Sequence, residues 1–143
     1  MIESQNCKIV SITPPAAIVD NAAFTTASVD TKGWDGALVC CYFGAMDIAM
    51  AALKLQHSDD DSSYADVTGG DFSTAGTLPS ASADNTFVGW AVNLQGKRRY
   101  LDVVATGGDG SAGTYMTAFV VLFRGATAPS TAAGRGFGQL LTV

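Results

Sequence analysis

The stretch from Tyr115 to Phe123 constrains the fold of this chain more than any other part of the sequence. It consists largely of β-branched and aromatic residues, which favour a strand, and it would carry apolar side chains on both faces of that strand. A soluble domain rarely exposes a large apolar patch, so both faces need a cover. The sequence leaves open whether the second cover is another sheet of the same chain or another subunit.

Apolar runs of strand length recur along the chain, separated by clusters of Gly, Ser, Asp, Thr and Pro. This pattern is typical of an antiparallel β-sandwich, so we predict an all-β fold. The predicted strands span 7–12, 23–29, 37–43, 86–94, 98–106 and 115–123. The strand at 37–43 is apolar on both faces and should lie inside a sheet, and Pro14-Pro15 should close the first strand. The strands at 86–94 and 98–106 read as a hairpin around Gly96-Lys97.

Two segments are less regular. The segment from Ile48 to His57 contains strong helix formers, but its second half alternates Leu53 and Leu55 with Lys54 and Gln56, which favours a half-buried strand. Residues 58–85 are polar and rich in turn-forming residues. We expect a long excursion there, with at most one short strand.

The length of 143 residues fits one domain. We predict a sandwich domain with its N-terminal segment over 1–124 and an extended arm over 125–143. The arm combines several glycines with Ala, Ser and Thr and ends in apolar residues. Such a tail is ordered when something holds it, so we expect a partner or a neighbouring subunit to do so.

Charge and composition exclude several function classes. The net charge is −5 and the basic residues are scattered apart from Lys97-Arg98-Arg99, so we expect no nucleic-acid binding. The beginning of the sequence has no signal-peptide pattern, and no apolar run is long enough to span a bilayer. The three cysteines, Cys7, Cys40 and Cys41, do not indicate a disulfide framework. We therefore expect synthesis and folding in a reducing cytoplasm, and no membrane partner.

The sequence also offers little chemistry for catalysis. His57 is the single histidine, and no nucleophile and base are paired in a recognisable motif, so we predict that the protein is not an enzyme. Gly108 to Gly113 matches a dinucleotide-binding pattern in spacing, but a strand and not a helix follows it. Asp59-Asp60-Asp61 lacks the spacing of a calcium loop, and the cysteines with His57 lack paired zinc-ligand spacing. We predict no cofactor and no metal.

Four stretches of the sequence resemble small virion proteins of tailed bacteriophages, and the likeness covers roughly residues 5–125 as a pattern of strands and turns. The resemblance rests on residues 30–35, 53–60, 64–67 and 99–108. It implies a jelly-roll-like sandwich that decorates the phage head as a cement protein. Such a protein is made in the host cytoplasm, lies on the capsid exterior and binds between major capsid protein subunits. It often forms a small oligomer, here a dimer or trimer.

Within this hypothesis the contacts would come from the two ends of the chain, by strand addition and by an apolar-tipped arm. The candidate contact residues are Ile9, Ile12, Arg135, Phe137, Leu140 and Leu141. Two alternatives remain. One is a head–tail or tail structural component. The other is a carbohydrate-binding sandwich in which Trp34, Trp90 or Tyr64 stacks on a sugar.

Overall fold

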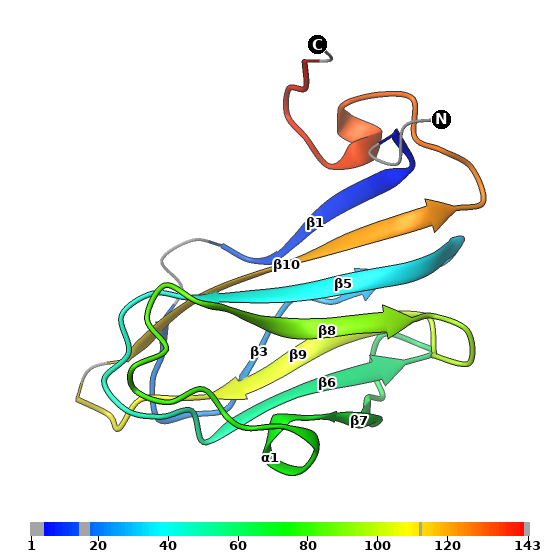
Figure 1. Cartoon of the computed structure of the whole chain (residues 1–143). Coiled ribbons are helices and arrows are strands. Elements are labelled where there is room, and N and C mark those ends of the chain that lie inside the picture. The colour runs from blue at the N-terminus through cyan, green and yellow to red at the C-terminus, as the bar shows by residue number, and fades with distance from the viewer. Residues whose placement is uncertain (1–4, 15–17, 112, 142–143) are drawn as a thin grey trace.

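Two antiparallel β-sheets pack face to face in the computed structural model, which describes residues 5–14, 18–111 and 113–141 (Figure 1). The all-β sandwich predicted from the sequence is confirmed. Pro15, which was expected to help close the first strand, lies outside the described residues, as do residues 1–4 of the N-terminal segment and 142–143 of the predicted arm. The prediction that the connections form a jelly roll stays a prediction.

The first sheet has the strand order β1-β10-β5-β8. A short strand, β2, pairs with the beginning of β10 on the edge that β1 also uses. The strands are β1 (Cys7–Thr13), β2 (Ile18–Val19), β5 (Trp34–Phe43), β8 (Phe87–Asn93) and β10 (Thr114–Gly125). The prediction that the strand at 37–43 lies inside a sheet is confirmed, because β5 has a partner on each side.

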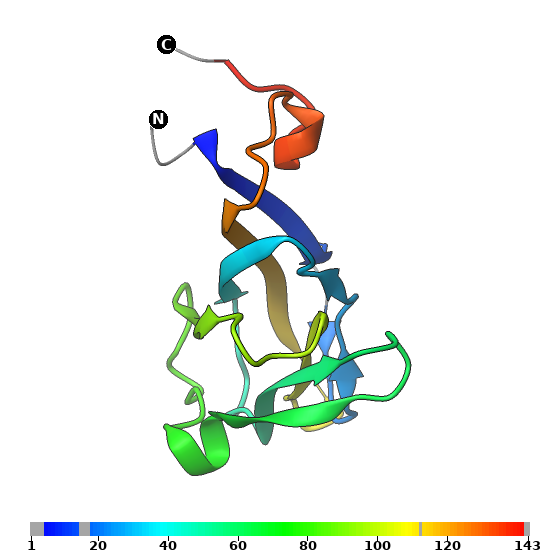
Figure 2. The same ribbon diagram turned by 90° about the vertical axis from the view of Figure 1, so that its right-hand side faces the viewer.

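The second sheet has the strand order β3-β9-β6-β7, with β4 also paired to β9. Its strands are β3 (Phe24–Thr25), β4 (Val29–Asp30), β6 (Ala52–Ser58), β7 (Ala65–Asp71) and β9 (Tyr100–Thr106). A single helical turn, α1 (Phe72–Ala75), follows β7, and its first N–H groups are capped by Asp71. Figure 2 shows the two sheets from the side, with β6 and α1 at the bottom of the molecule.

The core lies between the inner faces of these two sheets. Alternate residues of each long strand point into it, as the two-residue period of a strand requires. The fully buried members with the largest side chains include Phe43, Leu53, Leu55, Leu101, Met116 and Leu122. Burying these side chains is the main source of stability, at about 1.5–3 kcal/mol for each large apolar residue.

The structure shows which elements form at 48–57, 23–29 and 58–85. The segment at 48–57 contains a strand and not a helix, because β6 begins at Ala52 and buries Leu53 and Leu55. The predicted strand at 23–29 is two short strands, β3 and β4, on one edge of β9. Between them, Thr26 Oγ1 accepts a hydrogen bond from the Val103 N–H and so interrupts the regular ladder. The polar excursion contains β7 and α1.

The hairpin predicted for 86–94 and 98–106 is wrong, because β8 and β9 belong to different sheets. The turn itself exists: Gly96 has a φ of 74°, and the Lys97 N–H donates to the Leu94 carbonyl over 3.1 Å. It carries the chain from one sheet to the other. Two strands that each bury one apolar face can lie on opposite sides of the core as well as side by side, and the sequence pattern does not distinguish these arrangements.

Beyond Gly125 the described chain continues to residue 141 at one end of the sandwich, above β1 (Figures 1 and 2). It contains the 3-10 turn η2 (Ala133–Arg135), which packs against β1. Gly136 has a φ of 85° and lies against β1. A Cβ atom at this position would be 1.8 Å from the Ile9 carbonyl oxygen. This packing does not test whether a partner also holds the segment, which stays a prediction.

Candidate functional site: an uncharged apolar sheet face

The outer face of the first sheet, on the side away from the core, is apolar. The register of β5, β8 and β10 places alternate residues on this face in neighbouring rows. One row, for example, contains Phe119, Cys40 and Gly89, and the next contains Val121, Leu38 and Ala91. The outward residues of these three strands include Tyr115, Thr117, Phe119, Val121, Phe123, Gly36, Leu38, Cys40, Tyr42, Phe87, Gly89, Ala91 and Asn93. We call this set the outer face.

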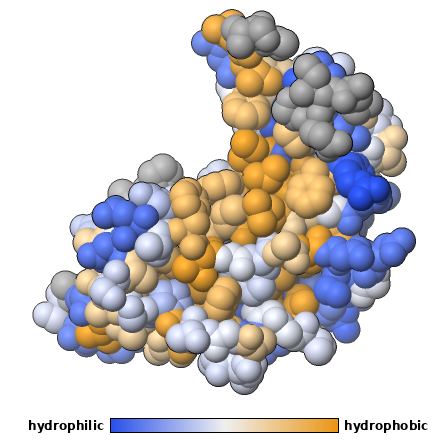
Figure 3. All heavy atoms as spheres, viewed as in Figure 1, coloured by the Kyte–Doolittle hydropathy of each residue, from blue (hydrophilic) through white to orange (hydrophobic). Residues whose placement is uncertain are grey.

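Several side chains of the outer face are open to solvent. Phe87 is 65% exposed, Tyr115 45% and Leu38 43%. Orange, apolar atoms gather across the middle of the molecule in the view that corresponds to Figure 1 (Figure 3). An apolar area of this kind on a soluble protein marks a surface that contacts protein or another apolar partner.

Aromatic rings form a cluster at one end of the outer face. The rings of Tyr42 and Phe87 are tilted against each other, with centroids 4.5 Å apart. Phe87 also meets the Phe119 ring edge-on at 6.3 Å. Such pairs hold the rings in defined positions, so the cluster presents a fixed shape to a partner.

The outer face contains no Asp, Glu, Lys or Arg side chain. Its polar members are Thr117, Asn93, the Cys40 thiol and the hydroxyls of Tyr42 and Tyr115. The Thr117 hydroxyl already donates to the Thr13 carbonyl over 2.9 Å. A partner that covers this surface therefore has to desolvate few polar groups and no charge, which removes the main cost of burial.

An open hollow of about 540 Å³ adjoins the far end of the outer face. Its lining includes Gly36, Ala91, Asn93 and Phe123, which belong to the strands of the first sheet. Asp35 and Arg124 also line it and bring opposite charges to its border. The apolar surface thus ends in a concave, polar margin, an arrangement common at protein interfaces.

The contact residues predicted from the sequence lie in three different environments. Ile9 pairs with Val121 and so extends the outer face onto β1, whereas Ile12 is 4% exposed and belongs to the core. In the C-terminal segment Leu140 and Leu141 are exposed, and Phe137 is half-buried. Arg135 is half-buried as well, and its Nε donates to the Pro129 carbonyl over 3.1 Å. The packing of Gly136 on Ile9 brings the N-terminal and C-terminal candidates to one end of the molecule.

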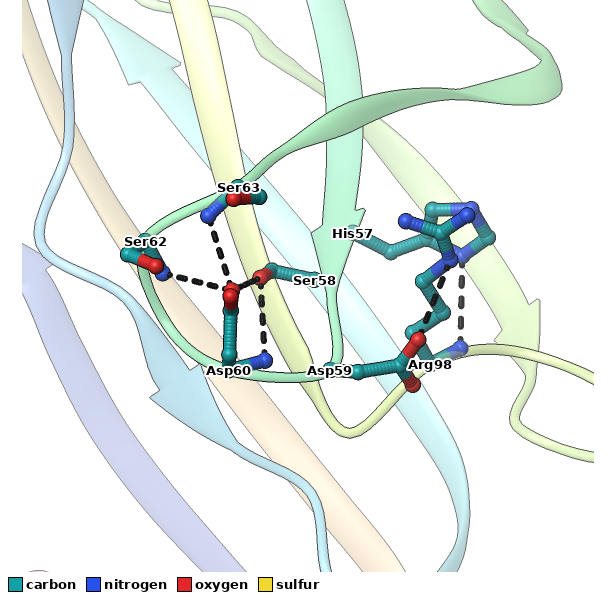
Figure 4. Close-up of polar contacts among 7 residues, drawn as sticks. All are labelled: His57, Ser58, Asp59, Asp60, Ser62, Ser63 and Arg98. Atoms are coloured by element: carbon teal, nitrogen blue, oxygen red, sulfur yellow. Dashed lines mark hydrogen bonds and ion pairs between the residues drawn. The ribbon is translucent and has the colours of Figure 1, made fainter.

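The acidic loop after β6 holds its carboxylates in local hydrogen bonds (Figure 4). The Asp60 carboxylate accepts hydrogen bonds from the Ser62 and Ser63 N–H groups and from the Ser58 hydroxyl. These bonds hold the pKa of Asp60 well below its usual range. Asp60 therefore acts as the organising residue of a tight turn.

His57 and Arg98 meet beside this loop (Figure 4). His57 Nδ1 accepts a hydrogen bond from the Arg98 N–H over 3.3 Å, and Arg98 forms an ion pair with Asp59 at 3.5 Å. Partial burial, together with the charges of Arg98 and Lys97, lowers the pKa of His57, so the imidazole is neutral near pH 7. The ring thus connects the end of β6 to the loop before β9.

Reactive or metal-binding groups do not converge on a site in the part of the chain that the structure describes. Across 5–14, 18–111 and 113–141, no group of three His, Cys, Asp or Glu residues is placed to hold a metal ion. Burial raises the pKa of Cys41 to about 12 and that of Cys40 in the same direction, so both thiols stay protonated and weakly nucleophilic. Within the described residues, no helix has the length and apolar character needed to cross a membrane.

Comparisons with known proteins add no relative to this description. No protein-family model matches the sequence, and no curated protein matches it significantly. The outer face therefore has to be interpreted from its own geometry.

Sequence reasoning identified part of the outer face. The two-sided apolar pattern of 37–43 and 115–123 indicated that both faces of these strands need a cover, and it left open whether the second cover is another sheet or another subunit. It missed Phe87, although the two-residue period of the predicted strand at 86–94 places Phe87 on the face opposite Val88, Trp90 and Val92. It also centred the contacts on the chain ends, where Ile12 proves to be a core residue.

Proposed function

We propose that this protein is a non-enzymatic structural protein of a phage virion, which decorates the head and binds between major capsid protein subunits. The observation that carries the proposal is the outer face, an uncharged apolar surface with Leu38, Phe87 and Tyr115 open to solvent. A surface of this composition is suited to adhesion between proteins, and burial raises the pKa of its one thiol, Cys40, so that this group stays protonated.

Repetition on a shell would make such adhesion effective. Each copy contributes a modest apolar contact, and many copies attached to one particle act together, so a moderate affinity per copy is enough to reinforce the shell. The charged share of the chain is 15%, below the roughly 25% usual for soluble domains. A low share of charge is expected when part of the surface is covered by other proteins.

The arrangement of the chain ends supports the same role. Ile9 continues the outer face onto β1, and the exposed Leu140 and Leu141 lie in the segment that packs beside it. A capsid subunit that covers the outer face could thus also meet the C-terminal segment. We propose that the decorated surface is the capsid exterior, that the protein is made in the host cytoplasm, and that it self-associates as a small oligomer. Most strand-to-strand connections cross between the two sheets, which favours a jelly-roll-like subunit.

The carbohydrate-binding alternative has weaker support. Trp90 is half-buried, its ring packs against Phe72 with centroids 5.2 Å apart, and its Nε1 donates to the Gly70 carbonyl. Trp34 is also half-buried and lies close to Gly125. Neither ring offers an open face comparable to that of Phe87. A structural role at the head–tail junction or in the tail would use the same apolar surface. The place on the particle where the protein binds distinguishes such a role from decoration of the head.

The test is a binding and stability assay on phage heads that lack the protein. Wild-type protein should bind the heads and raise the temperature at which they release DNA. Leu38→Asp and Phe87→Asp should each weaken binding by roughly tenfold or more, because each places a charge in a contact that excludes water. Thr68→Asp is the matched control, since Thr68 is exposed on β7 in the other sheet.

Two outcomes would contradict the proposal. One is that heads with and without the protein release DNA at the same temperature. The other is that the Leu38 and Phe87 variants bind as tightly as the Thr68 variant. A glycan array with the same proteins tests the rival function: sugar binding that Trp34→Ala abolishes would favour the carbohydrate-binding module.

A further inference from the structure

Each sheet of the sandwich has two edges, and most of these edges are protected against pairing with another chain. The edge formed by β3 and β4 consists of two short, interrupted strands. The β7 edge carries Asp66 and Asp71, and its pairing with β6 is irregular. The β1 edge has a bulge, and the C-terminal segment covers it at Ile9. Short strands, charges, bulges and covering segments are the usual means of preventing edge-to-edge association.

The β8 edge has none of these features. β8 runs from Phe87 to Asn93 without a charge, a proline or a register shift, and it pairs with β5 alone. Its sequence, Phe-Val-Gly-Trp-Ala-Val-Asn, has the alternating apolar pattern that favours addition of a further strand.

The hydrogen-bond pattern identifies which groups of β8 are unpaired on that edge. The Leu94 N–H donates to the Asp35 carbonyl, and the Phe43 N–H donates to the Thr86 carbonyl. In an antiparallel ladder every second residue bonds to the same neighbour, so the even-numbered residues of β8 face β5. The N–H and C=O groups of Phe87, Gly89, Ala91 and Asn93 therefore point to the open edge, where Gly89, Ala91 and Asn93 are exposed.

We propose that β8 pairs antiparallel with β8 of a second copy of this chain, across a two-fold axis near Ala91. An antiparallel strand pair is self-complementary, so one surface patch can serve both partners. With Ala91 at the axis, Gly89 of one copy lies opposite Asn93 of the other, and Trp90 lies opposite Val92. The small residues Gly89 and Ala91 leave room for close approach on the outer side of the joined strands.

The charges that flank β8 favour a second copy over an unrelated strand. Asp84 precedes the strand, Lys97 and Arg98 follow it, and no charged residue lies between them. Antiparallel pairing places the Asp84 end of one copy beside the Lys97 end of the other, on both sides of the axis. The chain is acidic overall, yet this contact brings opposite charges together.

Pairing through β8 would join the two first sheets into one continuous sheet. The outer faces of the two copies would then form a single apolar surface, because β8 lies at the border of each outer face. This arrangement deepens the proposed function, since it gives a capsid a contact of twice the size. It rests on the sheet edge and not on the outer face, so the two proposals fail separately.

The test measures self-association of the full chain by sedimentation over a wide concentration range. Wild-type protein should form dimers as its concentration rises. Ala91→Pro should weaken dimerisation by roughly tenfold or more, because it removes an edge N–H from each copy and places a ring against the partner strand. It leaves the ladder with β5 intact, since the Ala91 N–H points away from β5. Thr68→Asp, on β7 in the other sheet, is the control and should dimerise like the wild type.

A second set of variants covers the case in which Ala91→Pro fails to fold. Asn93→Pro removes another edge N–H and should have the same effect, while Leu38→Asp should leave the dimer intact and weaken binding to phage heads. Amide exchange should also slow at Gly89 and Ala91 as the protein concentration rises. The proposal is overturned if the wild type stays monomeric, if folded Ala91→Pro and Asn93→Pro dimerise normally, or if Leu38→Asp alone abolishes the dimer.

Discussion

The aromatic ring of Phe87 lies against that of Tyr42 on the outside of the first sheet, with 4.5 Å between their centroids. The two residues are opposite each other in the register of β8 and β5, so their contact is a cross-strand pair. Such a pair in water covers only part of each ring, and Phe87 stays 65% exposed. The contact therefore orders the rings without burying them, which leaves apolar area available to a partner.

The first prediction concerns dye binding by the native protein. The folded protein should bind an apolar fluorescent dye such as ANS, because the outer face is open to solvent. Phe87→Asp should lower the fluorescence clearly, whereas Thr68→Asp on the other sheet should leave it unchanged. Equal fluorescence of the two variants, with both folded by circular dichroism, would show that the dye binds elsewhere.

Gly89 provides a test of the backbone packing in the first sheet. A Cβ atom at this position would lie 2.0 Å from the Val39 carbonyl oxygen, and the β5 backbone has little freedom to move. We expect Gly89→Ala to destabilise the fold by about 2–3 kcal/mol, as in other overpacked sites. Urea unfolding measures the change. Gly138→Ala is the control, since that glycine has open space around it, and its effect should stay within about 0.5 kcal/mol.

The buried carboxyl group of Asp102 should make the free energy of unfolding decrease as the pH rises. Its side chain is buried, its Oδ1 has no hydrogen-bond partner among the described residues, and burial raises its pKa to about 6. Because the pKa of the folded state exceeds the ordinary value of 3.8, the protonated form is favoured by folding. The contribution of protonated Asp102 to the free energy of unfolding is full below about pH 4, decreases as the pH rises to about 6, and stays low above that pH.

Asp102→Asn should therefore flatten the stability profile between pH 4 and 6 and raise the free energy of unfolding at pH 8 by on the order of 1 kcal/mol. Thermal unfolding at a series of pH values measures this. The ion pair with Arg99 lowers the pKa of Asp30 to about 2, so its effect has the opposite sign and lies at lower pH. A variant profile parallel to that of the wild type between pH 4 and 6 would refute the assignment to Asp102.

Gly136 tests how the C-terminal segment is attached. Ala at this position would clash with the Ile9 backbone and would also have to adopt a φ of 85°, which an L-residue rarely does. We expect Gly136→Ala to release the segment from β1 and leave the sandwich folded. Trypsin should then cleave after Arg135 several-fold faster, while the melting temperature changes little. An unchanged cleavage rate would mean that Gly136 does not control the attachment.

The sequence predicted the strands that are regular and long. In β10 and β5 the density of apolar residues predicts a strand, and for β5 it also predicts a position inside the sheet. The alternation of Leu53 and Leu55 with polar residues predicts a strand at β6. The short strands β3 and β4 were not predicted separately, because between them the Thr26 hydroxyl oxygen accepts a hydrogen bond from the Val103 N–H, which no periodicity reveals. The hairpin prediction for β8 and β9 was wrong because their connection has the composition of a hairpin turn, although it carries the chain from one sheet to the other.

The sequence predicted that an apolar contact surface exists, but not which residues form it. An apolar run with two apolar faces indicates that something must cover it, and the outer face is the surface where this holds. Which residues form that surface depends on the register between strands that are distant in sequence, such as Phe119 with Cys40. Ile12 shows the reverse case: it lies three residues after Ile9, so the two-residue period of a strand places its side chain on the opposite face, in the core.

The pairing of β1 with β10 has a consequence for how the chain acquires its structure during synthesis. Cys7 pairs with Phe123, so β1 leaves the ribosome long before its partner β10 and cannot form its ladder until β10 follows. Contacts between residues so far apart in sequence make folding slow. The first sheet should therefore close only after β10 has been synthesised, and until then the apolar strands β1 and β5 remain open to chaperones or to premature aggregation.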